Sequence, residues 1–303
     1  MSVTRREFGL MVLVATSCAG ASLASTRQPL VIADVGMNPL GAIGDGVDFL
    51  AVSIGLSRDG VVMACAGPEL SSTTDVARHP AFADRRTTKS LEGEAVSGWF
   101  IEDFTQAELG ELELVDAANP RRRDKAVLRM DTLRGMMAIA RAGCVRTGRV
   151  IGIYVRARHA AHYAAAGLVL EARLADLIRL EGYNAAAAAM IIEVDDVRTL
   201  NALSRLSRAR KVLAISTRSA ETVTDFHSLR PAAQGLSMSE GSSSLIGAAH
   251  AAGLSLFVRV PSIDRRRLEA LFADGMDGVI TTATATSVWA RDTVMTRSPG
   301  GKT

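Results

Sequence analysis

The sequence predicts an α/β fold, and specifically a (β/α)8 TIM barrel with an insertion after the second strand. Short β-rich runs alternate with amphipathic helical runs over roughly 250 residues, which is typical of a parallel sheet covered by helices. With 303 residues, 48% of them hydrophobic, the chain is long enough for one large domain or two small ones. The number of runs favours the closed barrel, and a doubly wound α/β sheet is the alternative.

Eight apolar or β-branched runs are expected to form strands. They are Leu30–Ala33, Phe49–Leu56, Val61–Met63, Val150–Val155, Met190–Val194, Val212–Ile215, Leu254–Val260 and Gly278–Ile280. Apolar residues at helical spacing lie between them and predict helices. The expected helices are Ala160–Leu180, Val197–Leu206, Leu245–Ala252, Arg266–Phe272 and Ser287–Thr293.

Residues 57–127 interrupt this alternation with polar and charged stretches. In a barrel, a segment of this length after the second strand is a long excursion from one rim, where functional loops are usually found. We therefore expect it to form the insertion.

The first 24 residues are expected to be an export signal rather than part of the fold. Arg5-Arg6 and Phe8 precede a short, weakly apolar run, Leu10–Leu23, which ends in small residues suited to cleavage. This segment resembles a twin-arginine signal and is too short to span a bilayer permanently. The mature protein is then periplasmic or secreted. A disordered tail is one alternative, and lipidation at Cys18 is another.

The remaining residues, 25–303, are expected to form the barrel and carry little net charge. Removing the signal takes away two arginines and one glutamate, so the formal charge falls from +3 to +2. Arginines make up 31 of the 35 basic residues and are scattered among the acids, which argues against a nucleic-acid partner. The low Gly, Pro and Cys contents exclude collagen-like, disordered and disulfide-scaffold classes. Cys65 and Cys144 could pair in an oxidising compartment.

Motifs for familiar chemistry are few. The sequence contains neither a phosphate-binding glycine loop nor a nucleophile elbow. His159 and His162 are spaced like ligands on one helical turn but have no third ligand nearby, so we interpret them as exposed histidines at a helix start. Acidic candidates lie near the first two predicted strands and at the end of the strand Met190–Val194, where Asp195-Asp196 is also placed to cap a helix. These acids are Asp34, Asp45, Asp48, Glu193, Asp195 and Asp196.

Two stretches carry a resemblance to a known family. Residues 73–89 read TTDVARHPAFADRRTTK, and residues 98–105 read GWFIEDFT. Both resemble the insertion region of bacterial secreted glycerophosphodiester phosphodiesterases, and the similarity extends from Leu30 to about Leu114 and, more loosely, from Val150 onward. The resemblance implies a (β/α)8 barrel and an ancestor in lipid metabolism that hydrolysed glycerophosphodiesters to glycerol 3-phosphate and an alcohol.

The same resemblance implies a catalytic site that this chain has lost. The family uses two histidines as general acid and base and three carboxylates that hold a divalent cation such as calcium. The histidine positions fall at Asp34 and Ala66, and the carboxylate positions fall at Ala51, Ser53 and Arg156. The loop after the first strand also lacks the family's first helix. We therefore expect no cofactor and no catalysis.

Three hypotheses follow for the function. The first is a non-catalytic pseudoenzyme in which Arg156 pairs with Asp34 or Glu193 across the barrel mouth, or else extends into solvent. The second is a protein that binds a phosphate-bearing small molecule or another anion through Arg156 and Arg158. The third is a phosphoric diester hydrolase with a rearranged metal site at Asp34, Glu193 and Asp195.

Overall fold

The structure is a computed structural model that describes residues 28–34, 38–115, 128–215, 226–239, 243–260 and 264–297. The predicted export signal and Cys18 lie outside the described residues. Among the described helices, none combines the length and the apolar character that crossing a membrane requires.

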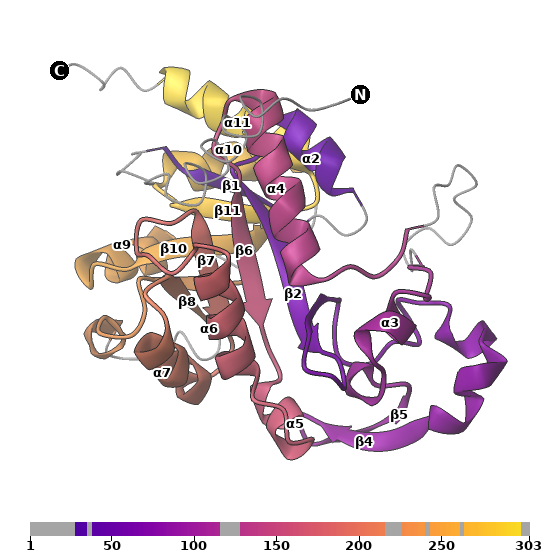
Figure 1. Cartoon of the computed structure of the whole chain (residues 1–303). Helices are drawn as coiled ribbons and strands as arrows, with labels where there is room; N and C mark the ends of the chain where they lie inside the picture. The colour runs from indigo at the N-terminus through magenta and orange to yellow at the C-terminus, as the bar shows by residue number, and fades with distance from the viewer. Residues whose placement is uncertain are drawn as a thin grey trace, which may run out of the picture.

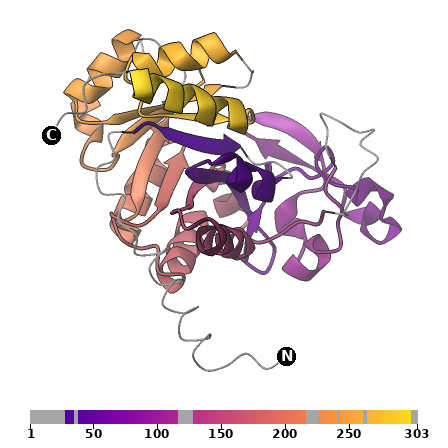
Figure 2. The same cartoon turned by 90° about the horizontal axis from the view of Figure 1, so that it is seen from above.

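Eight parallel strands close into a barrel, which confirms the predicted (β/α)8 fold (Figures 1 and 2). The sheet runs in the order β1-β11-β10-β9-β8-β7-β6-β2, and β1 also pairs with β2, so the ring has no free edge. The barrel strands are β1 (Leu30–Asp34), β2 (Phe49–Leu56), β6 (Gly152–Ala157), β7 (Met190–Val194), β8 (Arg210–Ala214), β9 (Gly235–Met238), β10 (Ser255–Val260) and β11 (Gly278–Thr281).

Helices follow the strands and cover the outside of the barrel. They are α2 (Pro39–Asp45), α4 (Leu133–Thr147), α5 (Ala160–Ala165), α6 (Leu170–Leu180), α7 (Val197–Leu206), η4 (Phe226–Leu229), α9 (Ser243–Ala251), α10 (Arg265–Ala273) and α11 (Thr284–Arg297). Several of these helices begin at a residue whose side chain caps the first turn. Thr132 accepts from the Gly135 amide, and Asp196 accepts from the Thr199 amide, as predicted for the Asp195-Asp196 pair.

The structure corrects two of the strand predictions. Val61–Met63 is not a barrel strand, because β3 (Val62–Ala64) pairs antiparallel with the end of β2 and lies outside the ring. The barrel strand missing from the predicted set is β9, which has only four residues and includes a glycine and a serine. It lacks the β-branched run that a sequence pattern requires, and only its two neighbours in the sheet give it strand geometry.

Two helix predictions were also wrong. The segment Ala160–Leu180 is two helices, because Gly167 adopts a left-handed φ of 76° between α5 and α6 and breaks the helical path. The loop after the first strand does contain a helix, α2, which begins under the cap of Asn38 with Pro39 in its first turn. Its seven residues make it much shorter than α4.

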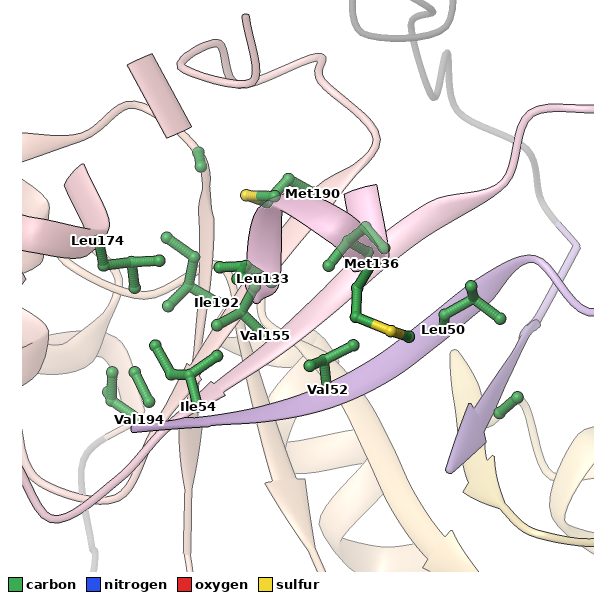
Figure 3. Close-up of a cluster of buried hydrophobic side chains, with 14 of the residues drawn as sticks. Leu50, Val52, Ile54, Leu133, Met136, Val155, Leu174, Met190, Ile192 and Val194 are labelled. Atoms are coloured by element: carbon green, nitrogen blue, oxygen red, sulfur yellow. The ribbon is translucent and has the colours of Figure 1, made fainter. Parts of the chain in front are cut away.

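Two hydrophobic layers hold the fold together. Inward-facing side chains fill the lower part of the barrel, namely Ile32, Phe49, Ala51, Tyr154, Ile191, Val212, Phe257 and Ile280. Outward-facing residues of β2, β6 and β7 pack under α4 and α6, as Leu50, Val155, Ile192, Met136 and Leu174 illustrate in Figure 3. The barrel bottom is therefore a packed core, which leaves only the carboxyl ends of the strands for a site.

The insertion lies to one side of the barrel, between β2 and α4 (Figures 1 and 2). Its elements are β3, η1 (Val76–Arg78), η2 (Pro80–Arg85), the hairpin β4 (Thr87–Leu91) and β5 (Glu94–Gly98), η3 (Ile101–Asp103) and α3 (Gln106–Leu109). The Trp99 indole donates to the Phe82 carbonyl at 2.7 Å, and Arg85 stacks on Phe82 and pairs with Glu108 at 2.6 Å. Residues from both stretches that resemble the family thus pack against each other within this unit.

Candidate functional site

The carboxyl ends of the strands bring charged side chains together at the barrel mouth. Along each strand, side chains alternate between the inside and the outside of the barrel. Ser53 of β2, Arg156 of β6 and Glu193 of β7 are paired in register across neighbouring strands and face inward. Asp34 ends β1 and Arg259 comes near the end of β10, so the closed ring places both at the same rim.

Arg156 forms a two-pronged ion pair with Asp34. Its Nη1 donates to Oδ2 at 2.9 Å and its Nη2 donates to Oδ1 at 2.6 Å. Only 12% of the Arg156 side chain is exposed, so the pairing predicted from the sequence is confirmed and the alternative of an Arg156 extended into solvent is wrong. Arg259 Nη1 adds a third contact to Asp34 at 3.1 Å. Both carboxylate oxygens of Asp34 therefore accept from guanidinium groups.

Glu193 is a fully buried carboxylate with four partners. Its Oε2 accepts from the Tyr154 hydroxyl at 2.8 Å and from the Ser237 hydroxyl at 2.7 Å. Its Oε1 accepts from Arg158 Nη2 at 2.9 Å and lies 3.6 Å from Arg259 Nη2. Burial alone would raise the pKa of Glu193, but Arg158 and the two hydroxyl donors outweigh it and hold the pKa below its ordinary value. Glu193 is therefore ionised at neutral pH.

The mouth network joins three arginines to two carboxylates: Arg156, Arg158, Arg259, Asp34 and Glu193. Burial and the adjacent Glu193 carboxylate raise the pKa of Tyr154 well above its ordinary value, so the phenol remains a donor. These five charges sum to +1. Asp195 and Asp196 lie at the same rim, so the mouth as a whole has no positive excess.

A cavity of about 490 Å³ opens beside this network. Its polar lining includes Arg158, Arg259, Asp195, Asp196, Ser237 and Ser239. The apolar part comes from the ends of β8, β9 and β11, including Ala214, Ile215 and Ile280. Neither Arg156 nor Asp34 is among the lining residues. The cations that line this cavity are therefore Arg158 and Arg259.

Comparison with protein families shows to which family the chain belongs. The model of the glycerophosphoryl diester phosphodiesterase family matches residues 40–286, most of the 303-residue chain. The chain belongs to this family. A glycerophosphodiester phosphodiesterase of Arabidopsis thaliana is 44% identical to it over 68 residues. That match spans 22% of this chain and 18% of the plant protein, so it covers less than a fifth of that relative.

Solved structures of this phosphodiesterase family share the barrel. A protein of Silicibacter pomeroyi described as a glycerophosphoryl diester phosphodiesterase has a TM-score of 0.66 and 14% identity, with 91% of this chain and 97% of that chain covered. A phosphodiesterase of Oleispira antarctica, solved with the product sn-glycerol-3-phosphate, has a TM-score of 0.58 and 17% identity over 88% and 97% of the two chains. At these identities the likeness concerns the fold.

The residues at which the resemblance is expected to place the family's metal and catalytic positions lie close to one another. Ala51 and Ser53 face inward on β2, and Ser53 is paired with Arg156 of β6. The backbone amide of Cys65 donates to the Ser53 carbonyl at 2.9 Å, which holds the loop with Ala66 beside the strand.

These residues do not fit a divalent cation. Ala51 and Ala66 offer no ligand, and both oxygens of Asp34 are occupied by arginines. Within the part of the chain that the structure describes, no three histidine, cysteine or acidic side chains are grouped so that they could hold a metal. Asp34, Glu193 and Asp195, which the rearranged-site hypothesis joins, are all described and form no such group.

The histidines of α5 pair with the insertion instead of facing solvent. His162 Nε2 lies 2.8 Å from Glu102 Oε1, and His159 Nδ1 lies 2.9 Å from Glu92 Oε1. The His162 side chain is 8% exposed, so the prediction of exposed histidines was wrong. The hairpin strand β4 reaches α5 in Figure 1, and the ion pairs of Glu92 and Glu102 join the insertion to the start of this helix. Local residue spacing could not predict these contacts, because the paired residues are about 60 residues apart in the chain.

The remaining candidates do not join the mouth. Asp48 accepts from the Val31 amide and pairs with Arg291 at 2.6 Å, and Asp45 accepts from Thr284. Both acids precede β2, at the opposite end of the barrel. Cys65 and Cys144 are free thiols, and burial raises the pKa of Cys65 to about 12. The pairing that an oxidising compartment would allow is not formed in this structure.

Proposed function

We propose that this family member has lost hydrolysis and is a non-catalytic pseudoenzyme with the phosphodiesterase fold. The observation that carries the proposal is the ion pair between Arg156 and Asp34, at 2.6 and 2.9 Å. A guanidinium at a position where the family has a metal-binding carboxylate repels a cation, and its pairing with Asp34 fills the space and neutralises both charges. The ion pair between Arg156 and Asp34 supports the proposal that the mouth of the barrel has been rebuilt without a metal ion.

The proton-transfer groups of the family are also missing. General acid and base catalysis needs a titratable group within hydrogen-bond reach of the reacting oxygens. Ala66 carries no titratable group, and both carboxylate oxygens of Asp34 are already paired with Arg156 and Arg259. Without a cation, the charge on a phosphodiester is not neutralised at the position where the family cleaves it.

The proposal predicts no hydrolysis by the mature protein. Purified residues 25–303 are incubated with glycerophosphodiesters in excess calcium or magnesium, and release of glycerol 3-phosphate is followed beside an active family member. We expect no release above the buffer blank. Cation-dependent release that Asp34→Ala abolishes would contradict the proposal and favour the rearranged hydrolase.

We propose that Arg156 itself does not bind an anion. Both Nη atoms of Arg156 are engaged by Asp34, and the side chain is largely buried. Binding a phosphate there would require breaking a pair that Arg156 forms with both prongs. Arg158, with a side chain 40% exposed, is the arginine that remains accessible.

We further propose that residues 1–24 direct export through the twin-arginine route, so that the protein acts in the periplasm or outside the cell. The support is the Arg5-Arg6 pair followed by Phe8 and a weakly apolar run. Replacing both arginines by lysine is expected to retain the unprocessed chain in the cytoplasm, as measured by cell fractionation. Export unchanged by this substitution would contradict the route.

A further inference from the structure

We propose that the end of the barrel opposite the mouth docks onto an anionic phospholipid membrane surface. The docking surface is made by the three loops that lead into β6, β7 and β8, namely residues 145–151, 180–189 and 205–211, which we call the basic rim. These loops lie at the amino-terminal end of the barrel, whereas sites for chemistry are built at the carboxyl end. The inference is therefore independent of the proposed loss of hydrolysis.

The three loops form one continuous surface. The strands β6, β7 and β8 that they precede are neighbours in the sheet. Glu181 of the second loop pairs with Arg141 of α4, the helix that leads into the first loop, at 2.8 Å. Asn184 Oδ1 of the second loop accepts from the Ser207 hydroxyl at 3.0 Å and from the Arg208 amide at 2.9 Å, both in the third loop. The side chains that these loops expose therefore lie near one another.

The basic rim carries positive charge that attracts anions, because the described residues leave it largely unpaired. Its cations are Arg146, Arg149, Arg205, Arg208, Arg210 and Lys211. Its one acid, Glu181, is already paired with Arg134 and Arg141 of α4 at 2.8 Å each. Among the described residues, none of the six cations forms an ion pair, although Arg149 also acts on Asp48 over a longer distance. Other acids at this end belong to the loops before β2 and β11, namely Asp45, Asp48, Asp274 and Asp277.

Two of the cations are partly or fully buried with no carboxylate beside them. Arg210 stands two residues before the inward-facing Val212, and its buried Nε and Nη2 atoms have no hydrogen-bond partner among the described residues. Lys211 Nζ donates to the carbonyls of Ser207 and Ala209 at 2.6 and 2.8 Å. Burial lowers the pKa of Lys211 to about 8, so this amine still carries its proton at neutral pH. An anion from outside would stabilise both charges.

Aliphatic side chains are exposed among these cations. Leu180 is 76% exposed, Val145 is 52%, Leu206 is 41% and Val150 is 38%. The three alanines 185–187 of the second loop are exposed as well. A single exposed aliphatic residue is ordinary, but a group of them on three adjacent loops indicates an interaction surface.

The arrangement of these side chains favours a membrane over an acidic protein. Each of the four exposed aliphatic residues adjoins an arginine in the sequence, and these arginines are Arg146, Arg149, Arg179 and Arg205. Protein interfaces place an apolar centre inside a polar border, whereas here the two kinds of side chain alternate. A bilayer surface suits this alternation, because guanidinium groups bind headgroup phosphates while aliphatic side chains enter the acyl boundary. In this orientation the mouth of the barrel faces the solution.

Sedimentation with lipid vesicles tests the inference. Residues 25–303 are used, because they include every described element and omit the apolar run Leu10–Leu23, which could bind lipid by itself. We expect the protein to sediment with vesicles of phosphatidylglycerol and phosphatidylcholine, but not with vesicles of phosphatidylcholine alone. Binding should fall steeply when the ionic strength is raised from about 0.1 M to about 1 M, since salt screens the attraction.

Two variants separate the charge from the apolar contacts. The double variant Arg205→Gln, Arg208→Gln is expected to weaken binding about thirtyfold, from about fivefold for each cation removed near an anionic surface. Leu180→Ser keeps the charge and is expected to weaken binding about tenfold, because the leucine no longer enters the acyl boundary. These three side chains are exposed, so the circular dichroism spectrum should not change.

Matched controls lie at the mouth side of the helices. Arg266→Gln with Arg267→Gln removes two exposed arginines from the start of α10, and Leu40→Ser removes a leucine that is 55% exposed near the start of α2. Both controls should bind anionic vesicles as the wild type does.

Three results would overturn the inference. They are no sedimentation of the wild type with anionic vesicles, equal sedimentation with neutral vesicles, and binding that the Arg205, Arg208 double variant retains in full. Salt-sensitive binding that Leu180→Ser leaves unchanged would indicate a purely electrostatic surface suited to an acidic protein, and it would also contradict membrane docking. None of these measurements depends on whether the mouth hydrolyses a phosphodiester.

Discussion

Replacing Glu193 by alanine is expected to lower the free energy of unfolding by about 3–5 kcal/mol, the loss typical of breaking a buried ion pair from one side. The carboxylate is fully buried and accepts from Tyr154, Ser237 and Arg158. Without it, two buried hydroxyls lose their acceptor and the guanidiniums of Arg158 and Arg259 are left with less negative charge. Urea denaturation at pH 7, followed by circular dichroism, measures the change.

Two variants serve as controls for this result. Glu193→Gln keeps an acceptor for the hydroxyl groups but removes the charge, so its loss should be smaller than that of alanine. Asp176→Ala removes an acid from an exposed pair with Arg179 and should change the free energy of unfolding by less than about 1 kcal/mol. A Glu193→Ala variant as stable as Asp176→Ala would mean that the mouth network does not hold the barrel together.

The same carboxylate makes stability depend on pH in a defined direction. The pKa of Glu193 in the folded protein lies below that of an unfolded glutamate, which is about 4.3. The unfolded chain therefore binds more protons in the acid range, and the contribution of Glu193 is fully present above that value and is lost as the pH falls through the folded pKa. Glu193→Gln should show a weaker fall in stability below about pH 4 than the wild type.

The parts of the fold that could be predicted are those encoded locally or by the family pattern. The helix Val197–Leu206 was predicted with the bounds that α7 has, because an N-cap and an apolar spacing mark it. The pair between Arg156 and Asp34 could be predicted because the resemblance placed both residues at one rim, and a buried lone arginine is costly. The register needed for that step came from matches at Gly36, Asp48-Phe49, Asp59-Gly60 and Thr73, while the two stretches in the insertion carried most of the resemblance itself.

The residues of those stretches have a structural role in the insertion. Trp99, Arg85 and Glu108 hold the insertion together through the Phe82 contacts and the ion pair described above, and Lys89 pairs with Glu102 and Asp103 at 2.7 Å each. None of these residues lines the cavity. A family match carried by packing residues is therefore compatible with the proposed loss of the catalytic site.

The rest of the site could not be predicted because its residues come from strands far apart in the chain. Tyr154, Ser237 and Arg259 join Asp34 and Glu193 only when the barrel closes, and 225 residues separate Arg259 from Asp34. Arg259 lies in the apolar run Leu254–Val260, where one inward arginine has no local signature. Ser237 belongs to the short strand β9, which was missed altogether. The exposure of Arg158 could not be predicted either, because it depends on the shape of the cavity that Arg158 lines.

Restoring the three carboxylates is expected to create a cation site that the wild-type protein lacks. In the variant with Ala51→Glu, Ser53→Asp and Arg156→Glu, the side chains face inward from two neighbouring strands, since Ser53 and Arg156 are paired in register. Removing the Arg156 guanidinium also frees one side of Asp34. Hard oxygen ligands of this kind bind calcium, with a dissociation constant on the order of 10⁻⁴ M for a site of ordinary rigidity.

Calorimetric titration with calcium measures the gain, and unfolding with and without calcium shows whether the ion stabilises the folded state. The single variant Arg156→Glu is the decisive control, because it reverses the same charge but leaves Ala51 and Ser53 without ligands and should not bind. Arg179→Glu makes the same charge change on the surface of α6. If the triple variant folds and binds no calcium, Ala51, Ser53 and Arg156 do not occupy the family's ligand positions, and the argument that this mouth lost its metal by substitution at those positions is wrong.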